Sequence, residues 1–151
     1  MMEREEFSTV IYAPKEKVWR VLWGEDTYPV WTSYFSDGSR AESDWKEGSR
    51  VVFLNAKNEG MISKIARREE NRYMSFEHQG FIDAEGREDL ESEQVKKWAG
   101  ATENYTLKEE DGKTKLIVDM DMDDAYKDHF REVFPQALNR VKELSEDKTL
   151  N

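Results

Sequence analysis

Two titratable side chains, Glu103 and His78, are the candidates for chemistry in this sequence. Glu103 alternates with Tyr105 on one predicted strand, and His78 alternates with Phe76 on another. Because alternate residues of a strand share a face, each titratable group is expected beside an aromatic ring. A carboxylate and a histidine that face each other can act as an acid/base pair. Strand numbering does not give the distance between them, so this pair is a hypothesis.

Each of these side chains also has a structural interpretation. An unpaired charge on an apolar face costs free energy. Glu103 therefore either lies in water at the open end of the sheet, pairs with a basic side chain, or anchors a ligand hydroxyl or amine. His78 is either a base or a hydrogen-bonded structural residue.

A run of acidic residues near position 120 suggests calcium but does not fit an EF-hand. A loop that begins at Asp119 requires glycine at position 124 and glutamate at position 130, where the chain has Asp124 and Phe130. A loop that begins at Asp121 has Ala125 and Tyr126 where a ligand and the glycine are required. Strand alternation explains the run, so we predict no calcium site.

Other motifs for metals, nucleotides and nucleophiles are incomplete. His129 and Glu132 are three apart on a predicted helix, but no third ligand is evident. Ser145 and Lys148 match a Ser-x-x-Lys pattern only in a polar tail. The chain has no cysteine, no phosphate-binding loop and no nucleophile elbow. We therefore predict no metal, no cofactor and no assigned catalytic residue.

Composition indicates one folded, acidic domain over residues 1–151. The chain has 33 acidic and 23 basic residues, a net charge of −10, which argues against a nucleic-acid partner. Five Trp, six Tyr and seven Phe oppose disorder. No apolar run approaches the roughly 18 residues of a membrane span, and the opening residues lack the apolar stretch of a signal peptide. We expect a cytoplasmic protein.

Periodicity predicts an α+β order of elements. A strand over residues 7–12 stops before Pro14, a helix over Lys15–Trp23 ends at Gly24, and a second short helix begins near Thr27. Six strands are then expected over residues 40–43, 50–55, 61–68, 72–78, 102–109 and 113–122. The inward phase of 61–68 is open, since the residues around Ser63 and those around Ile62 both fit.

The last two strands form a hairpin around Asp111-Gly112, a pair typical of a two-residue type I′ turn. This turn places Glu103 opposite Met120, and Tyr105 opposite Val118. A slip of one residue would scatter the apolar side chains over both faces, so we expect this register.

A long amphipathic helix is predicted over residues 124–147. Its apolar stripe is Tyr126, Phe130, Phe134, Ala137, Leu138, Val141 and Leu144. Pro135 cannot donate a hydrogen bond to the carbonyl of Arg131, so we expect a kink or a short break there.

The order of elements resembles the helix-grip fold of the SRPBCC (START-like) superfamily. The opening STVIYAPKEKVWRVL, with Ala13, Pro14, Val18 and Trp19, resembles that superfamily's first strand and helix start. The ending ENYTLKEEDGKTKLIVDMD resembles the branch related to the activator of the ninety-kilodalton heat-shock chaperone's ATPase. The resemblance implies a curved seven-stranded antiparallel sheet around the final helix, with two short helices after the first strand. It also implies a cavity between sheet and helix.

Two interpretations of the inward side chains remain open. The rings and methionines either fill the interior as a packed core or line a pocket for an apolar ligand. The candidate ligand-binding residues are Trp31, Phe53, Met74, Phe76, His78, Trp98, Glu103, Tyr105, Val118, Met120, Phe130 and Phe134. Ser92 is expected to cap a short helix over residues 93–99. Its Trp98 either covers the cavity mouth together with Trp23 or Trp31, or packs the loop against the outer surface of the sheet.

Three functions follow from this sequence. The first is non-catalytic binding of a small hydrophobic or amphipathic ligand. The second is a co-chaperone-like domain that stimulates a chaperone ATPase through its surface. The third is a cyclase-like or hydrolase-like enzyme that uses Glu103 and His78. The ligand, the partner and the oligomeric state are not determined.

Overall fold

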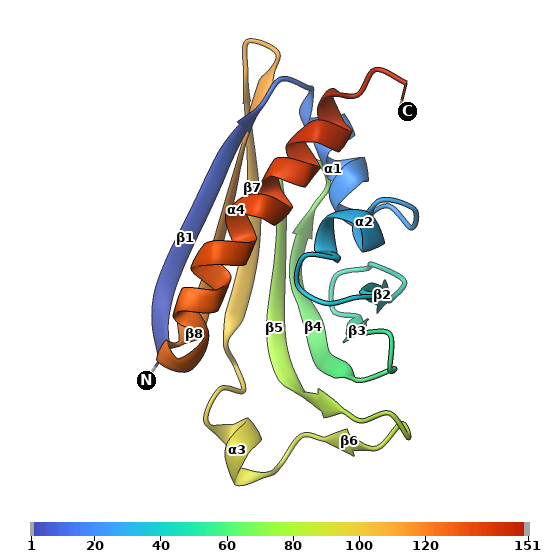
Figure 1. The fold of residues 1–151 in the computed structure, drawn as a ribbon, viewed down its shortest axis with the longest axis vertical. Helices are drawn as coiled ribbons and strands as arrows, with labels where there is room; N and C mark the ends of the chain where they lie inside the picture. Colours follow the sequence, from blue (N-terminus) through green and yellow to red (C-terminus); the bar gives the residue numbers. More distant parts are fainter. Residues whose placement is uncertain (1, 150–151) are drawn as a thin grey trace.

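The computed structural model describes residues 2–149 and shows a curved antiparallel sheet with a long helix across its concave side (Figure 1). The elements are β1 Met2–Ile11, α1 Lys15–Trp23, α2 Tyr28–Thr32, β2 Arg40–Glu42, β3 Arg50–Leu54, β4 Gly60–Glu69, β5 Tyr73–Ile82, β6 Glu88–Asp89, α3 Glu93–Lys96, β7 Thr102–Glu110, β8 Lys113–Asp123 and α4 Asp124–Glu146. This is the helix-grip fold, and the predicted order of elements is confirmed. The two-residue β6 was not predicted.

The sheet runs in the order β1-β8-β7-β5-β4-β3-β2, and β6 pairs with the end of β5. Every pairing between neighbouring strands is antiparallel. The β7–β8 hairpin has the predicted register, with Glu103 opposite Met120 and Tyr105 opposite Val118. Asp111 and Gly112 both have positive φ, at 55° and 78°, as a type I′ turn requires.

The two helices that follow β1 are joined to each other through backbone carbonyls. The Trp31 Nε1–H of α2 donates to the carbonyl of Leu22 in α1 at 3.1 Å. The Thr27 hydroxyl donates to the carbonyl of Val21 at 2.6 Å. Since these bonds link the end of α1 to α2, they fix the turn that places aromatic rings over the sheet.

Helix α4 packs on the sheet through its middle and C-terminal turns. Phe134, Leu138 and Val141 are buried in the common core, whereas Tyr126 is 59% exposed. The prediction that Tyr126 belongs to the buried stripe was therefore wrong. Helix α4 begins directly after β8 at the end of the sheet (Figure 1), and its first residues, Asp124, Ala125 and Tyr126, are all exposed.

Pro135 does not interrupt α4, which is continuous from Asp124 to Glu146. The predicted short break is therefore absent. Pro135 lies on the exposed side of the helix. Proline has no N–H to donate to the carbonyl of Arg131, but water can hydrogen-bond to that carbonyl instead.

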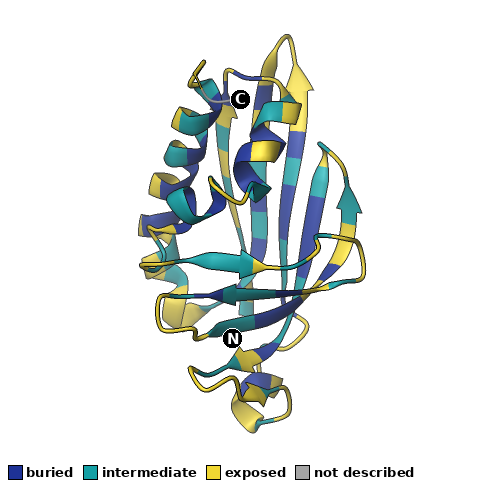
Figure 2. Ribbon diagram, turned by 90° about the vertical axis from the view of Figure 1, so that its right-hand side faces the viewer, coloured by how far each residue is buried: buried dark blue, intermediate teal, exposed yellow. Residues whose placement is uncertain are grey.

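The core lies between the sheet and the three helices α1, α2 and α4. Figure 2 shows buried residues along the middle of the strands and on the inner sides of these helices. Its side chains come from every part of the chain, as Ile11, Trp31, Phe76, Val118 and Leu138 illustrate. Folding therefore requires β1 and α4 to meet the central strands.

We predict that Gly60→Ala is strongly destabilising. A Cβ atom at Gly60 would overlap the backbone carbonyl oxygen of Phe53 on β3, and backbone cannot move aside as a side chain can. We expect a loss of about 3 kcal/mol in the free energy of unfolding, measured in urea.

Gly112→Ala is the matched control for that change. A Cβ atom at Gly112 would have no heavy atom within 4 Å, but the residue has a φ of +78°. The expected cost is therefore only the left-handed conformation, about 1 kcal/mol. Equal losses in the two variants would contradict the proposed clash.

Candidate functional site

Four polar side chains form a continuous hydrogen-bonded chain on the concave face of the sheet. Ser63 Oγ lies 2.7 Å from His78 Nδ1, and His78 Nε2 lies 3.2 Å from Glu103 Oε1. The Tyr105 hydroxyl donates to Glu103 Oε2 at 2.5 Å. The two side chains singled out from the sequence are therefore in contact. We name Ser63, His78, Glu103 and Tyr105 the polar chain.

The sheet register brings these residues together from three neighbouring strands. Strand β4 pairs Ser63 with His78, and β5 pairs Phe76 with Glu103. His78 lies two residues after Phe76 and so shares its face. The inward phase of this β4 segment was open in the sequence. The β4–β5 register is irregular at Ile62/Ser63, and both residues are fully buried there, so the strand does not follow a simple alternation.

Proton positions in the polar chain follow from the acceptors. An ionised Glu103 carboxylate can only accept, so His78 Nε2 carries a proton and donates to it. His78 Nδ1 then accepts from the Ser63 hydroxyl when the ring is neutral. Ser63 orients the ring in this arrangement, since its fully buried hydroxyl is not accessible to a substrate.

Glu103 retains access to solvent although it lies among rings. Its side chain is 22% exposed, and that of His78 is 12% exposed. A carboxylate offers about four acceptor positions, and His78 and Tyr105 each occupy one. Glu103 can therefore accept a further hydrogen bond or pair with a cation from outside the protein.

Aromatic rings surround the polar chain. Trp23 lies 5.0 Å from Tyr105 between ring centroids, and Phe53 lies 5.2 Å from Phe76 and 6.5 Å from His78. This apolar wall lowers the local dielectric, which strengthens the hydrogen bonds within the polar chain.

Besides burial, the charge of Glu103 contributes to the raised pKa values of two tyrosines. Burial raises the pKa of Tyr28, and the Glu103 carboxylate raises it further. The pKa of Tyr105 is also raised, first by burial and then by the charge of Glu103 and its hydrogen bond. Both phenols therefore remain neutral at physiological pH, and Tyr105 remains a donor to Glu103.

The predicted ligand-binding residues fall into three groups. The polar chain and its wall include Trp31, Phe53, Phe76, His78, Glu103 and Tyr105. Met74, Val118, Met120 and Phe134 are buried in the core, and Phe130 packs against it with partial exposure.

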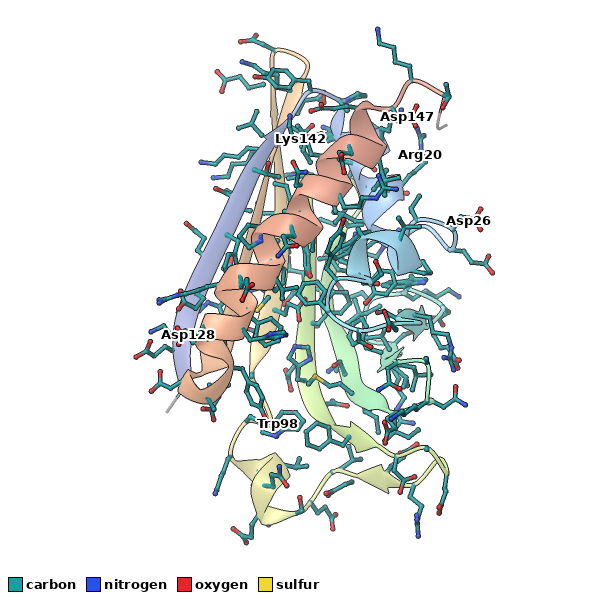
Figure 3. All side chains as sticks on the ribbon, in the orientation of Figure 1. Arg20, Asp26, Trp98, Asp128, Lys142 and Asp147 are labelled. Atoms are coloured by element: carbon teal, nitrogen blue, oxygen red, sulfur yellow. The ribbon has the colours of Figure 1, made fainter. Side chains whose placement is uncertain are left out.

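Trp98 lies apart from the other predicted residues. Its ring contacts Phe81 at a centroid distance of 4.8 Å, beside α3 and the end of β5 (Figure 3). Trp23 and Trp31 belong to the cluster around α1 and α2, so Trp98 does not cover a cavity mouth with either. Helix α3 ends at Lys96, earlier than predicted, although Ser92 caps it as expected.

Sequence reasoning missed several residues that contribute to the site. Ser63 completes the polar chain, and Tyr28 and Trp45 extend its aromatic wall. Ser63 belongs to one of the two inward phases that the sequence left open for its strand. The register irregularity at this position cannot be seen in the sequence. Trp45 lies between β2 and β3, where periodicity carries no signal.

A pocket lies beside the polar chain rather than on it. It has a volume of about 720 Å³ and lies between the α1–α2 segment and β2, with Trp23, Tyr28 and Trp45 in its wall. Another, smaller pocket of about 210 Å³ is lined by Arg67, Tyr73 and residues near them. Glu103 and His78 line neither pocket.

Neither a metal centre nor a membrane helix is found in residues 2–149. No three potential His, Asp or Glu ligands gather there in a way that could hold a metal ion. In the same residues, no helix is both long and apolar enough to cross a bilayer.

The sequence matches one protein-family model. Residues 12–146 match the model described as Activator of Hsp90 ATPase homolog 1-like protein. Among curated proteins, none matches this chain.

Solved structures share the fold at low sequence identity. A protein of Mesorhizobium loti is 14% identical with a TM-score of 0.71, over 93% of this chain and 95% of that one. The Aha1 dimer of Colwellia psychrerythraea is 14% identical with a TM-score of 0.70, over 96% and 97%. Ara h 8.0201 is 11% identical with a TM-score of 0.65, over 95% and 97%. At such identities the similarity shows the fold alone.

We predict that the buried tyrosines make the protein sensitive to alkali. A pKa that folding raises favours the native state fully below the unfolded value near 10, and that stability is lost as the pH rises above it. With Tyr28 and Tyr105 both affected, the free energy of unfolding should fall by about 1.4 kcal/mol per pH unit for each.

Tyr28→Phe should remove about half of that alkaline decline, measured by urea unfolding between pH 9 and pH 12. Tyr12→Phe, on a ring that is 65% exposed, is the control and should keep the wild-type slope. Identical slopes in wild type and Tyr28→Phe would contradict the assignment.

Proposed function

This chain belongs to the family of Activator of Hsp90 ATPase homolog 1-like proteins, and from that premise we propose that it binds a small amphipathic molecule on the concave face of its sheet. The binding is non-catalytic, and Glu103 is its polar anchor. The proposal specifies the candidate residues within a family whose fold supports ligand binding or co-chaperone-like roles.

The observation that carries the proposal is a partly exposed carboxylate in an aromatic wall. Glu103 is held by His78 and Tyr105 and is 22% exposed. Small-molecule sites are mostly apolar, with a few fixed polar groups that orient the ligand. The polar chain fits that description, because its internal bonds hold Glu103 in place before any ligand arrives.

The chemistry of the anchor indicates the polar end of the ligand. A carboxylate accepts hydrogen bonds, so the ligand must present a hydroxyl or an amine rather than a carboxylate. Its apolar remainder would pack against partly exposed rings such as Phe53 and Phe130. Each methylene that is buried there would contribute about 0.8 kcal/mol.

The same geometry disfavours the enzyme hypothesis. Ser63 is fully buried, and a nucleophile must reach the substrate. Hydrogen bonding within the polar chain instead suits a fixed anchor.

We predict that linear amphiphiles bind according to their head group. Titrations with decylamine, decanol and decanoate, monitored by tryptophan emission below micelle-forming concentrations, should give binding of the first two and weaker binding of decanoate. Glu103→Gln should weaken decylamine binding by about tenfold, because a hydrogen bond to a charged group contributes about 1.5–3 kcal/mol. Decanol binding should change less.

Glu110→Gln is the matched control. Glu110 lies at the exposed far end of the same strand, so its loss changes the net charge equally without affecting the anchor. If Glu110→Gln and Glu103→Gln alter decylamine binding equally, only the general charge matters. If no amphiphile binds, and native mass spectrometry of freshly purified protein finds no retained small molecule, the proposal is wrong.

An alternative function is stimulation of a chaperone ATPase, which the family's description suggests. The dense packing of rings around Tyr105 also supports it, because a filled interior leaves the surface as the functional part. We expect, on this alternative, that the purified chain raises the ATPase rate of its host's ninety-kilodalton chaperone. Glu103→Gln should stimulate as well as wild type does. No stimulation and no complex with the purified chaperone would exclude it.

A further inference from the structure

The pocket between the α1–α2 segment and β2 lies beside the polar chain, and neither Glu103 nor His78 lines it. Its volume of about 720 Å³ lies within the range that small-molecule sites span. The α1–α2 loop, marked by Asp26 in Figure 3, forms one side, and β2 with the following residues forms the other.

Three aromatic rings in the wall of this pocket form one cluster. The centroid distances are 5.6 Å between Trp23 and Trp45, 6.4 Å between Trp23 and Tyr28, and 6.4 Å between Tyr28 and Trp45. The three centroids form a triangle with sides of at most 6.4 Å, so a cation placed over this triangle can lie within about 6 Å of each centroid, the range over which a cation is attracted to a ring.

The backbone conformation of Trp45 is an independent sign of a special site. Its φ is +63°, a left-handed conformation that is a genuine outlier for a bulky residue. The turn is held in place by a bond from the Trp45 amide to Ser43 Oγ at 3.0 Å. Strain of this kind clusters at ligand clamps and active sites, and here it directs the ring toward Trp23 and Tyr28.

Charge around the pocket favours a cation. Arg40 and Glu42 both line it, and their charges offset each other at a separation of 3.5 Å. Arg40 also donates to the carbonyl of Asn55 at 3.2 Å and to Asn58 Oδ1 at 2.6 Å. Glu25 lines the pocket too, is exposed, and forms no ion pair with a residue in the range 2–149. The lining therefore has a net negative charge.

We propose that the pocket formed by Trp23, Tyr28 and Trp45 binds an organic cation with a methylated or quaternary ammonium group. The alkylated nitrogen lies against one side of the ring cluster, and Glu25 supplies the opposite charge. A quaternary ammonium suits this site better than a metal ion, since the aromatic wall offers ring faces rather than oxygen ligands.

Choline is the probe that tests this site. We expect a titration followed by the N-methyl proton resonance of choline to saturate, with a Kd on the order of 1 mM. Its neutral carbon isostere, in which carbon replaces the quaternary nitrogen, should bind at least about threefold more weakly. Equal affinities for choline and for the isostere would overturn the cation assignment, and this test needs only the wild-type protein.

Variants of the pocket then locate the site. Trp45→Leu and Glu25→Gln should each weaken choline binding by about threefold or more. Glu25 is exposed, so its replacement leaves folding intact even if Trp45→Leu lowers the melting temperature. Tyr73→Leu removes a ring from the distant smaller pocket and should bind choline like wild type.

Two outcomes would overturn the proposal. One is the absence of saturation by choline at constant ionic strength, which would mean that the rings form only core packing. The other is equal loss of binding in Tyr73→Leu and Trp45→Leu, which would indicate non-specific attraction to an acidic protein. Glu103→Gln should keep most of its choline binding, so failure of the amphiphile proposal does not decide this one.

Discussion

The packing of α1, α2 and α4 against the concave side of one antiparallel sheet is the constraint on which the structure depends. Trp31 is almost wholly buried and donates to the carbonyl of Leu22, so α2 cannot leave the sheet without losing a buried hydrogen bond and an aromatic contact with Tyr105. Phe134 of α4 stacks on Phe7 of β1 at 4.8 Å. Because the first strand and the last helix meet in this way, the ends of the chain close the same core that its middle strands line.

Within this core the polar chain is tolerated because its buried groups are satisfied. Ser63, His78 and Tyr105 each bond to a neighbour in the polar chain, and Glu103 accepts from two of them. An isolated carboxylate in the same position would be costly. The low dielectric of the surrounding rings strengthens those bonds, so one arrangement positions Glu103 and also makes the phenols of Tyr28 and Tyr105 hard to ionise.

The aromatic cluster joins two places that differ in chemistry. On its inner side Trp23 and Tyr28 approach Tyr105 and the charge of Glu103. On its outer side the same two rings, with Trp45, line the pocket beside β2. The family and the shared helix-grip fold explain the layered framework, but function is decided at sites such as these two rather than by the fold.

Local patterns in the sequence were sufficient for the order of elements, the bounds of α1 and the register of the β7–β8 hairpin, because each depends on residues that are close in the chain. Glu103 and His78 could be recognised as candidates because strand alternation is local too. Their contact depends on how β5 pairs with β7, two strands that are not consecutive in the sequence. The part of Ser63 depends on the irregular register between β4 and β5. The position of Trp45 also depends on the tertiary structure. The exposure of Tyr126 and the uninterrupted helix at Pro135 depended on which side of α4 faces the sheet. Periodicity determines which side chains share a face, but only tertiary packing decides what lies opposite that face.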